Sequence, residues 1–215
     1  MKTLLCILLP LLLVGVGIAF FLPTTEAKPM RDLKEAMAGH KILVVYYSRT
    51  GSNYVSGDIV DLPVGNTAAV AQMIRDKTGA DVVELRTVKA YPTDYKATTE
   101  EAKKELRENA RPELVGGGVV KDLAQYDTII LGYPNWWGTA PMSIFSFLEK
   151  NDLAGKTILP LCTHEGSGMG RSVKDLKKAL PQSQVKQGLP IHGTRVYKKD
   201  AAIPGEVEAW LCENL

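Results

Sequence analysis

From position 41 onward, continuous apolar runs alternate with amphipathic stretches along the chain. A strand that is covered on both faces needs no polar alternation, so the apolar runs predict strands at 41–47, 81–85, 128–133, 157–162 and, more weakly, 189–191. The amphipathic stretches predict helices at 67–78, 98–109, 143–149 and 172–180, and a closing helix from Pro204. Thr98 and Glu101 have the spacing of a capping box, which would begin the second helix.

Strands that alternate with helices of this length predict an α/β fold with a doubly wound parallel sheet in three layers. Five strands favour the order 2-1-3-4-5. Its ligand crevice lies at the carboxyl ends of strands one, three and four. The residues that follow these three strands are therefore the candidates for function.

The N-terminus carries an uncharged stretch of 19 residues, 4–22, preceded by Lys2. This length is close to the ~20 residues of a membrane-spanning helix and exceeds the ~7–15 of a signal-peptide core. Residues 25–27 form a poor cleavage site. We expect residues 1–27 to be a retained signal anchor; a cleaved signal peptide, which would make the protein secreted, and a start placed too far upstream are the alternatives.

Residues 28–40 are expected to be a tether, and residues 41–215 a single domain. The positive charges flank the apolar stretch on both sides, with Lys2 before it and Lys28, Arg31 and Lys34 after it. The positive-inside bias is therefore nearly cancelled. The signal-like layout favours a domain outside the cytoplasm, held at the membrane by the N-terminal segment.

Charge and cysteine content exclude several classes of protein. A net charge of +2 over 215 residues is too small for a nucleic-acid-binding surface, which needs a concentrated basic patch. Cys6, Cys162 and Cys212 form no CxxC pair and no metal-ligand spacing with the three histidines. We therefore expect no metal site, and two buried thiols in the domain.

The segment after the first strand has the composition of a phosphate cradle. Ser48, Arg49, Thr50 and Gly51 are followed by 14 residues and then by Asn66 and Thr67, which open a helix. Hydroxyl groups and unpaired N–H groups at a helix N-terminus favour a bound anion. The segment lacks both GxGxxG and the lysine of a P-loop, which disfavours dinucleotides and triphosphates. An ordinary turn with a helix cap is the alternative.

The segment after the third strand contains two adjacent tryptophans. It runs through Pro134, Asn135, Trp136, Trp137 and Gly138. Large aromatic rings are costly to expose and hard to bury in a loop, whereas they suit stacking on a planar ligand. We expect one tryptophan to fill the core below the loop and the other to face a ligand.

The segment after the fourth strand is rich in glycine. It contains Thr163, Glu165, Gly166, Ser167 and Gly168. Glycines allow close backbone approach and positive φ, so this loop can offer N–H groups to a ring carbonyl. A flexible connection is the alternative. His164 as a general acid or base is a further alternative, although a lone histidine is more often structural.

Together these segments resemble the flavodoxin family. Ser48 to Gly51 with Asn66 and Thr67 is similar to the family's phosphate signature, Ser-x-Thr-Gly-Asn-Thr, split by an insertion at 52–65. The other two loops resemble a branch of the same family. The resemblance implies FMN as cofactor, with Ser48, Thr50, Asn66 and Thr67 on the phosphate. Trp136, Trp137 and Gly138 would lie against the isoalloxazine ring, and residues 165–168 at its other edge.

The insertion is a departure from the family pattern. Either Asn53 and Tyr54 within it lie over the flavin, which we favour, or the insertion weakens phosphate binding. The expected function is an FMN-dependent oxidoreductase in which the protein tunes the cofactor and supplies no catalytic side chain. Residues 136–141 also resemble a loop of NAD(P)H:quinone reductases. The expected redox partner is a quinone, NAD(P)H or a protein, and the sequence does not identify which.

Two other functions stay open on the sequence. A non-catalytic electron carrier of the flavodoxin type is the first, although such carriers are usually strongly acidic and this chain is not. A binding module that keeps the fold without a flavin is the second. The colour of the purified protein, and NAD(P)H oxidation with and without a quinone, separate the three.

Overall fold

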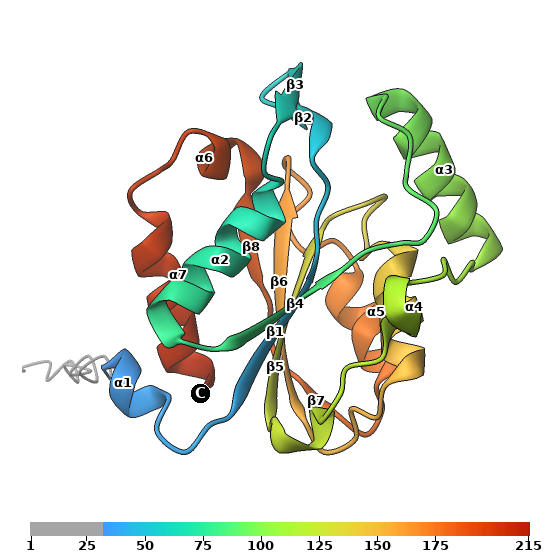
Figure 1. The fold of residues 1–215 in the computed structure, drawn as a ribbon. Helices are drawn as coiled ribbons and strands as arrows, with labels where there is room; N and C mark the ends of the chain where they lie inside the picture. The colour runs from blue at the N-terminus through green and yellow to red at the C-terminus, as the bar shows by residue number, and fades with distance from the viewer. Residues whose placement is uncertain (1–31) are drawn as a thin grey trace, which may run out of the picture.

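The computed structural model describes residues 32–215, and the expected signal anchor at 1–27 lies outside them. A parallel sheet forms the centre of the molecule, with its strands in the order β4-β1-β5-β6-β7 and β8 also paired with β6 (Figure 1). The strands are β1 (Ile42–Tyr47), β4 (Asp81–Leu85), β5 (Thr128–Pro134), β6 (Thr157–His164), β7 (Gln184–Val185) and β8 (Leu189–His192). The predicted order 2-1-3-4-5 is confirmed, with β7 and β8 sharing the fifth place.

Helices cover both faces of the sheet, which gives the three predicted layers (Figure 1). One face carries α1 (Leu33–Ala36), α2 (Asn66–Thr78), α6 (Gly193–Tyr197) and α7 (Ile203–Asn214). The other face carries α4 (Met142–Lys150) and α5 (Ser172–Ala179). α3 (Tyr95–Glu108) lies beside these two and stands further from the sheet. Two short 3-10 helices, Val115–Gly118 and Leu123–Gln125, lie between α3 and β5.

The core is divided into two by the sheet, because successive side chains of a strand point to opposite faces. Leu43 and Val45 of β1 pack towards α4 and α5. Ile42 and Val44 pack towards α2 and α7. All six residues of β1 are buried, as the continuous apolar run at its position predicts.

The insertion at 52–65 is mostly a β-hairpin. β2 (Gly51–Val55) and β3 (Asp58–Leu62) pair antiparallel with each other, and form a sheet separate from the main one. Ser56 and Gly57 connect them with positive φ angles of 53° and 105°. Two central residues with positive φ are typical of the tight turns that suit the twist of a hairpin. The hairpin lies beyond the carboxyl ends of the main strands (Figure 1).

The predicted start of the helix at 98–109 is wrong by three residues. α3 begins at Tyr95, and its N-cap is Asp94, whose Oδ1 accepts a hydrogen bond from the backbone N–H of Ala97 at 2.7 Å. Thr98 is instead buried within the first turns, where its hydroxyl donates to the carbonyl of Pro92. Aspartate is among the preferred N-cap residues, and here it replaces the predicted capping box.

Part of the expected tether has regular structure. Leu33 and Ala36 of α1 are buried and belong to the same core cluster as Val207 and Leu211 of α7. Within residues 32–215, no helix combines the length and the apolar composition that crossing a bilayer requires. Cys162 and Cys212 are both buried, as predicted.

Candidate functional site

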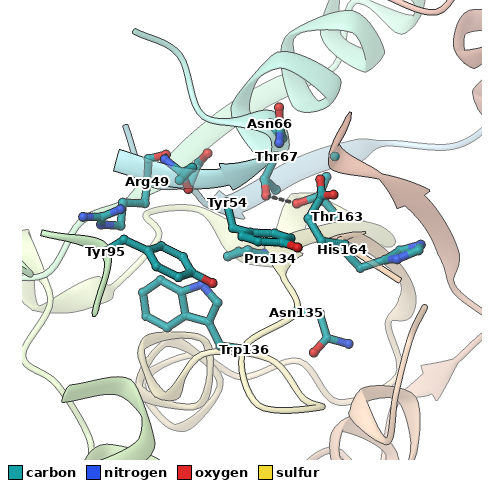
Figure 2. Close-up of a pocket in the computed structure, with 14 residues that line it drawn as sticks. Arg49, Tyr54, Asn66, Thr67, Tyr95, Pro134, Asn135, Trp136, Thr163 and His164 are labelled. Atoms are coloured by element: carbon teal, nitrogen blue, oxygen red, sulfur yellow. Dashed lines mark hydrogen bonds between the residues drawn. The ribbon is translucent and has the colours of Figure 1, made fainter. Parts of the chain in front are cut away.

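A cleft opens at the carboxyl ends of β1, β5 and β6, where the strand order predicts a crevice. Its cavity volume is about 130 Å³, which is below the roughly 300–1,000 Å³ of most small-ligand sites. Its lining includes nine of the residues predicted from the sequence: Ser48, Arg49, Asn66, Thr67, Pro134, Asn135, Trp136, Thr163 and Glu165. Figure 2 shows Tyr95 and Trp136 on one side of the cleft and Thr163 and His164 on the other.

One end of the cleft is built around the N-terminus of α2. Ser48 Oγ accepts a hydrogen bond from the N–H of Ala68 at 3.1 Å and so holds the strand end against the helix. A Cβ atom at Gly65, the N-cap residue, would overlap both Ser48 Oγ and the carbonyl of Arg49. The first N–H groups of a helix have no partner within it, so Asn66 and Thr67 begin a site suited to an anion.

Thr67 and Thr163 join this helix to β6. Their hydroxyl oxygens lie 2.7 Å apart, and both side chains are buried. The contact ties two of the three predicted loops together at the floor of the cleft (Figure 2). Because the Thr67 hydroxyl is already bonded, its backbone N–H is the better placed group for an anion.

Arg49 lies in the cleft wall, with its guanidinium bonded to backbone carbonyls. It donates to the carbonyls of Pro92 and Thr93, each at 2.8 Å, and also to that of Ser52. Burial lowers the pKa of Arg49 from its ordinary value. The side chain therefore holds the start of the hairpin against the segment before α3.

Aromatic side chains form the wall opposite β6. The ring of Trp136 meets the rings of Tyr47 and Tyr91 edge-on, with centroid distances of 5.5 and 5.1 Å. This packs Trp136 against the core while it also lines the cleft. Tyr95, at the start of α3, lies beside it (Figure 2). Such a wall suits the flat face of an aromatic ligand.

Trp137 and Gly138 form a tight turn at the rim. Trp136 and Thr139 bond to each other through both backbone N–H groups, and φ is 54° at Trp137 and 83° at Gly138. Positive φ is strained for a bulky residue. Trp137 is 46% exposed, and its Nε1–H donates to the carbonyl of Thr99 in α3 at 2.9 Å. It lines a hollow that adjoins the cleft.

Asn135 links the tryptophan loop with the glycine-rich loop. Its Oδ1 accepts from the N–H of Gly138 and its Nδ2 donates to the carbonyl of Gly168, both at 2.9 Å. Gly170 approaches the same turn so closely that a Cβ there would overlap the carbonyl of Gly138. The amide of Asn135 thus fixes the spacing between the two loops.

Glu165 presents an unsatisfied oxygen at the opposite side of the cleft. Its Oε2 accepts from the hydroxyl of Thr194 at 2.7 Å. Its Oε1 is buried and has no hydrogen-bond partner within residues 32–215. A Cβ at Gly193 would come within 2.7 Å of this oxygen and close to the amide of Asn66. A buried acceptor without a partner is costly, so Glu165 suits a ligand that donates a hydrogen bond.

His164 contacts a second histidine rather than a catalytic partner. Its Nδ1 accepts from the N–H of Gly166 at 3.0 Å, and its ring centroid lies 5.3 Å from that of His192. Burial, and then the neighbouring His192, lower the pKa of His164. The neutral imidazole is the favoured form at this position.

The remaining predicted residues lie around the cleft rather than in its lining. They are Thr50, Gly51, Gly138, Gly166, Ser167 and Gly168, with Trp137 in the adjoining hollow. Thr50 is exposed and precedes β2. The sequence misses Tyr95 and Gly193, which line the cleft, and it leaves open the role of Asn53 and Tyr54, which do so too. The sequence contains one signal for Tyr95, namely that it is an aromatic residue at the start of a helix.

Comparisons with known proteins agree with this geometry. A family model described as Flavodoxin matches residues 41–202. A structure described as a flavoprotein from Bacteroides uniformis is 26% identical, with 79% of this chain and 99% of that one covered and a TM-score of 0.60. Another from Bacteroides eggerthii is 27% identical, with 76% and 98% covered and a TM-score of 0.58.

A third similar structure, a flavoprotein in complex with FMN from Lactobacillus acidophilus, shares the fold at 20% identity. The match covers 74% of this chain and 97% of that one, with a TM-score of 0.52. No curated protein matches the chain.

Proposed function

The chain belongs to the flavodoxin family, and from this premise we propose that it is an FMN-dependent oxidoreductase. The observation that carries the proposal is the continuity of the cleft. An anion site at the start of α2 and an aromatic wall formed by Tyr95 and Trp136 line the same cleft. FMN combines a phosphate and a flat ring in the same order.

The residues of the cleft fit FMN at each end. The N–H groups of Asn66 and Thr67 would hold the phosphate, because the helix dipole adds to their attraction for an anion. Trp136 and Pro134 would face the ring. The unsatisfied Oε1 of Glu165 would accept from a hydroxyl or ring N–H group. Bound FMN supplies transfer of one or two electrons, and the protein positions and tunes it.

A hollow beside the cleft supports an enzyme over a simple electron carrier. Its cavity volume is about 350 Å³, and it shares Tyr95 and Trp136 with the cofactor cleft. Two compartments with a common aromatic wall give a second substrate room next to the ring. A quinone or NAD(P)H, both of which carry flat rings, is the class of redox partner that we propose. The mild net charge of +2 also differs from the acidic surface of a typical carrier.

Binding of FMN and of riboflavin to three proteins tests the site. Asn66→Pro removes one of the N–H groups that would hold the phosphate, at the first position of α2, where proline is tolerated. It should weaken FMN more than riboflavin, because hydrogen bonds to a charged group contribute about 1.5–3 kcal/mol. Asn66→Ala keeps this N–H group and is the matched control. Equal losses for both flavins, or a loss with Asn66→Ala as large as that with Asn66→Pro, would contradict this arrangement of the phosphate site.

Turnover separates the enzyme from the carrier. The protein loaded with FMN should oxidise NADH or NADPH, and added quinone should accelerate the reaction. A yellow protein that is reduced by neither nucleotide, but exchanges single electrons with a reduced protein partner, would be a carrier. A colourless protein that takes up no FMN would be a binding module without flavin.

We also propose that the N-terminal segment holds the domain at a membrane. The support is the uncharged stretch at 4–22, whose length matches the ~20 residues of a spanning helix. Deletion of residues 1–27 should release the protein from the membrane fraction and leave its absorption spectrum unchanged. Full-length protein found in the soluble fraction with Met1 intact would contradict the proposal.

A further inference from the structure

The hairpin of β2 and β3 is held to the rest of the domain by few contacts. Its strands pair only with each other. Most of its side chains are exposed or half-buried, and among them only Val55 and Leu62 are buried. A two-stranded hairpin is marginally stable alone, and segments with few buried contacts open with low free energy. This element can therefore move as a unit.

The hairpin spans the mouth of the cleft from one side to the other. β2 contacts both α3 and α6. On the α3 side, the ring of Tyr54 stacks on that of Tyr95, with centroids 6.3 Å apart and planes at 29°. On the other side, the N–H of Ser56 lies 3.5 Å from Oε2 of Glu165, at the limit of hydrogen bonding. Both of these attachments are weak, whereas the base of the hairpin is held by Arg49, which donates to the carbonyl of Ser52.

Tyr54 points into the middle of the cleft. Figure 2 shows its ring above Pro134, between Tyr95 and Trp136 on one side and Thr163 and His164 on the other. The ring is 41% exposed, and its hydroxyl makes no hydrogen bond to any of residues 32–215. The side chain is thus a flat aromatic group that lies in the ligand space without being fixed there.

We propose that the hairpin at 51–62 is a lid and that Tyr54 is its ring-capping residue. In this structure Tyr54 lies in the space between the two loops that would face the flavin ring. When FMN binds, the lid lifts, and Tyr54 closes on the outer face of the ring. This inference rests on the proposed function, because it takes FMN as the ligand. It makes the hairpin the element that controls flavin exchange.

Rates of FMN binding and release measure the lid directly. In Tyr54→Ala the association rate should rise, because no side chain has to leave the ring space. The dissociation rate should also rise, by about two- to tenfold, the equivalent of one lost aromatic contact. Stopped-flow quenching of flavin fluorescence gives both rates.

Two further variants separate the ring from other effects. Tyr54→Phe keeps the ring and should behave as the wild type, because the hydroxyl has no partner. Tyr197→Ala removes the same side chain at a site of similar exposure, 47%, outside the cleft lining, and should leave both rates unchanged. A Tyr54→Phe variant that matches Tyr54→Ala would overturn the capping role of the ring.

Hydrogen exchange of the hairpin amides gives a second readout that does not depend on any variant. FMN should slow exchange in residues 51–62 more than in α7, which is remote from the cleft. A wild type that binds FMN with unchanged hairpin exchange, or with rates equal to those of Tyr54→Ala, would overturn the lid while the proposed function stands. A wild type that binds no FMN would overturn both.

Discussion

Trp136 and Trp137 are neighbours in the sequence, but their side chains have different surroundings in the structure. Trp136 packs edge-on against Tyr47 and Tyr91 and lines the cleft. Trp137 lies at the rim, bonded to the carbonyl of Thr99 and beneath the ammonium group of Lys103, which lies 4.9 Å from its ring centroid. Trp136 therefore contacts both the core and the cleft, and Trp137 connects the rim of the cleft with α3.

Alanine variants of the two tryptophans should differ in both stability and binding. Trp136→Ala should lower the free energy of unfolding by about 3 kcal/mol, at the low end for a large aromatic residue because the side chain is only partly buried, and should weaken FMN binding. Trp137→Ala should cost about 1 kcal/mol, the value of one hydrogen bond, with FMN affinity unchanged. Urea titrations and flavin binding measure these effects, and the reverse order would contradict the assignment.

The stability of the protein should depend on pH through His164. Burial and the neighbouring His192 lower its pKa below the ordinary value of 6.5. The unfolded chain therefore binds more protons just below pH 6.5, so the contribution is complete above that pH and is lost as the pH falls towards the folded pKa. An NMR titration should give the lowered pKa, and His164→Gln should flatten the stability curve in this window. A pKa above 6.5 would contradict the prediction.

At the scale of single residues, the sequence predicts most of the residues that line the cleft. It misses residues that lie outside the three loops after the predicted strands. Ser48 and Trp136 follow strands whose order is predictable, and Asn66 opens the helix after the first of these strands, so it is predictable that the three residues lie close together. Tyr95 follows no strand of that set and begins a helix whose start the sequence misplaces. It reaches the cleft only through the packing of α3, which no local pattern encodes.

At the scale of elements, the largest difference from prediction is the hairpin in the insertion. Its signal is present in the sequence: Ser56 and Gly57 form a two-residue turn between short runs that contain Val55 and Ile59. The polar residues Ser52, Asn53 and Asp61 interrupt the apolar pattern that predicts a strand. They are tolerated because the hairpin packs little of its surface against the core. Strands that are defined by burial are predictable, whereas a strand that pairs over an open cleft is not.

The start of α3 provides a test of the observed cap against the predicted one. Asp94→Ala removes the side chain that accepts from the N–H of Ala97 and should cost about 1 kcal/mol, the usual value of an N-cap. Glu101→Ala, which would damage a capping box at Thr98, should cost less, because Glu101 instead pairs with Lys89 at the surface. Thermal unfolding measures both, and a larger loss at Glu101 would favour the predicted capping box.

At the scale of the whole molecule, the strand order determines where chemistry is possible. β1, β5 and β6 lie side by side in the sheet, so the loops after them converge, although β1 ends at residue 47 and β6 at residue 164. The apolar runs predict the buried strands, and the alternation of these strands with helices predicts their order in the sheet. The boundary of the domain is less predictable, because the short helix α1 has too few residues to show a period.

That boundary leads to a prediction about the smallest stable domain. Residues 32–215 should be more stable than residues 41–215 by about 1.5–3 kcal/mol, because Leu33 is buried against α7 and full burial of a leucine contributes that much. Leu33→Ala in the longer chain should reproduce most of the difference. FMN affinity should be equal in all three proteins, since no residue of 32–40 lines the cleft. Equal stabilities would place the start of the folded domain at residue 41 and leave α1 outside it, whereas the expected loss would make α1 the first element of the domain.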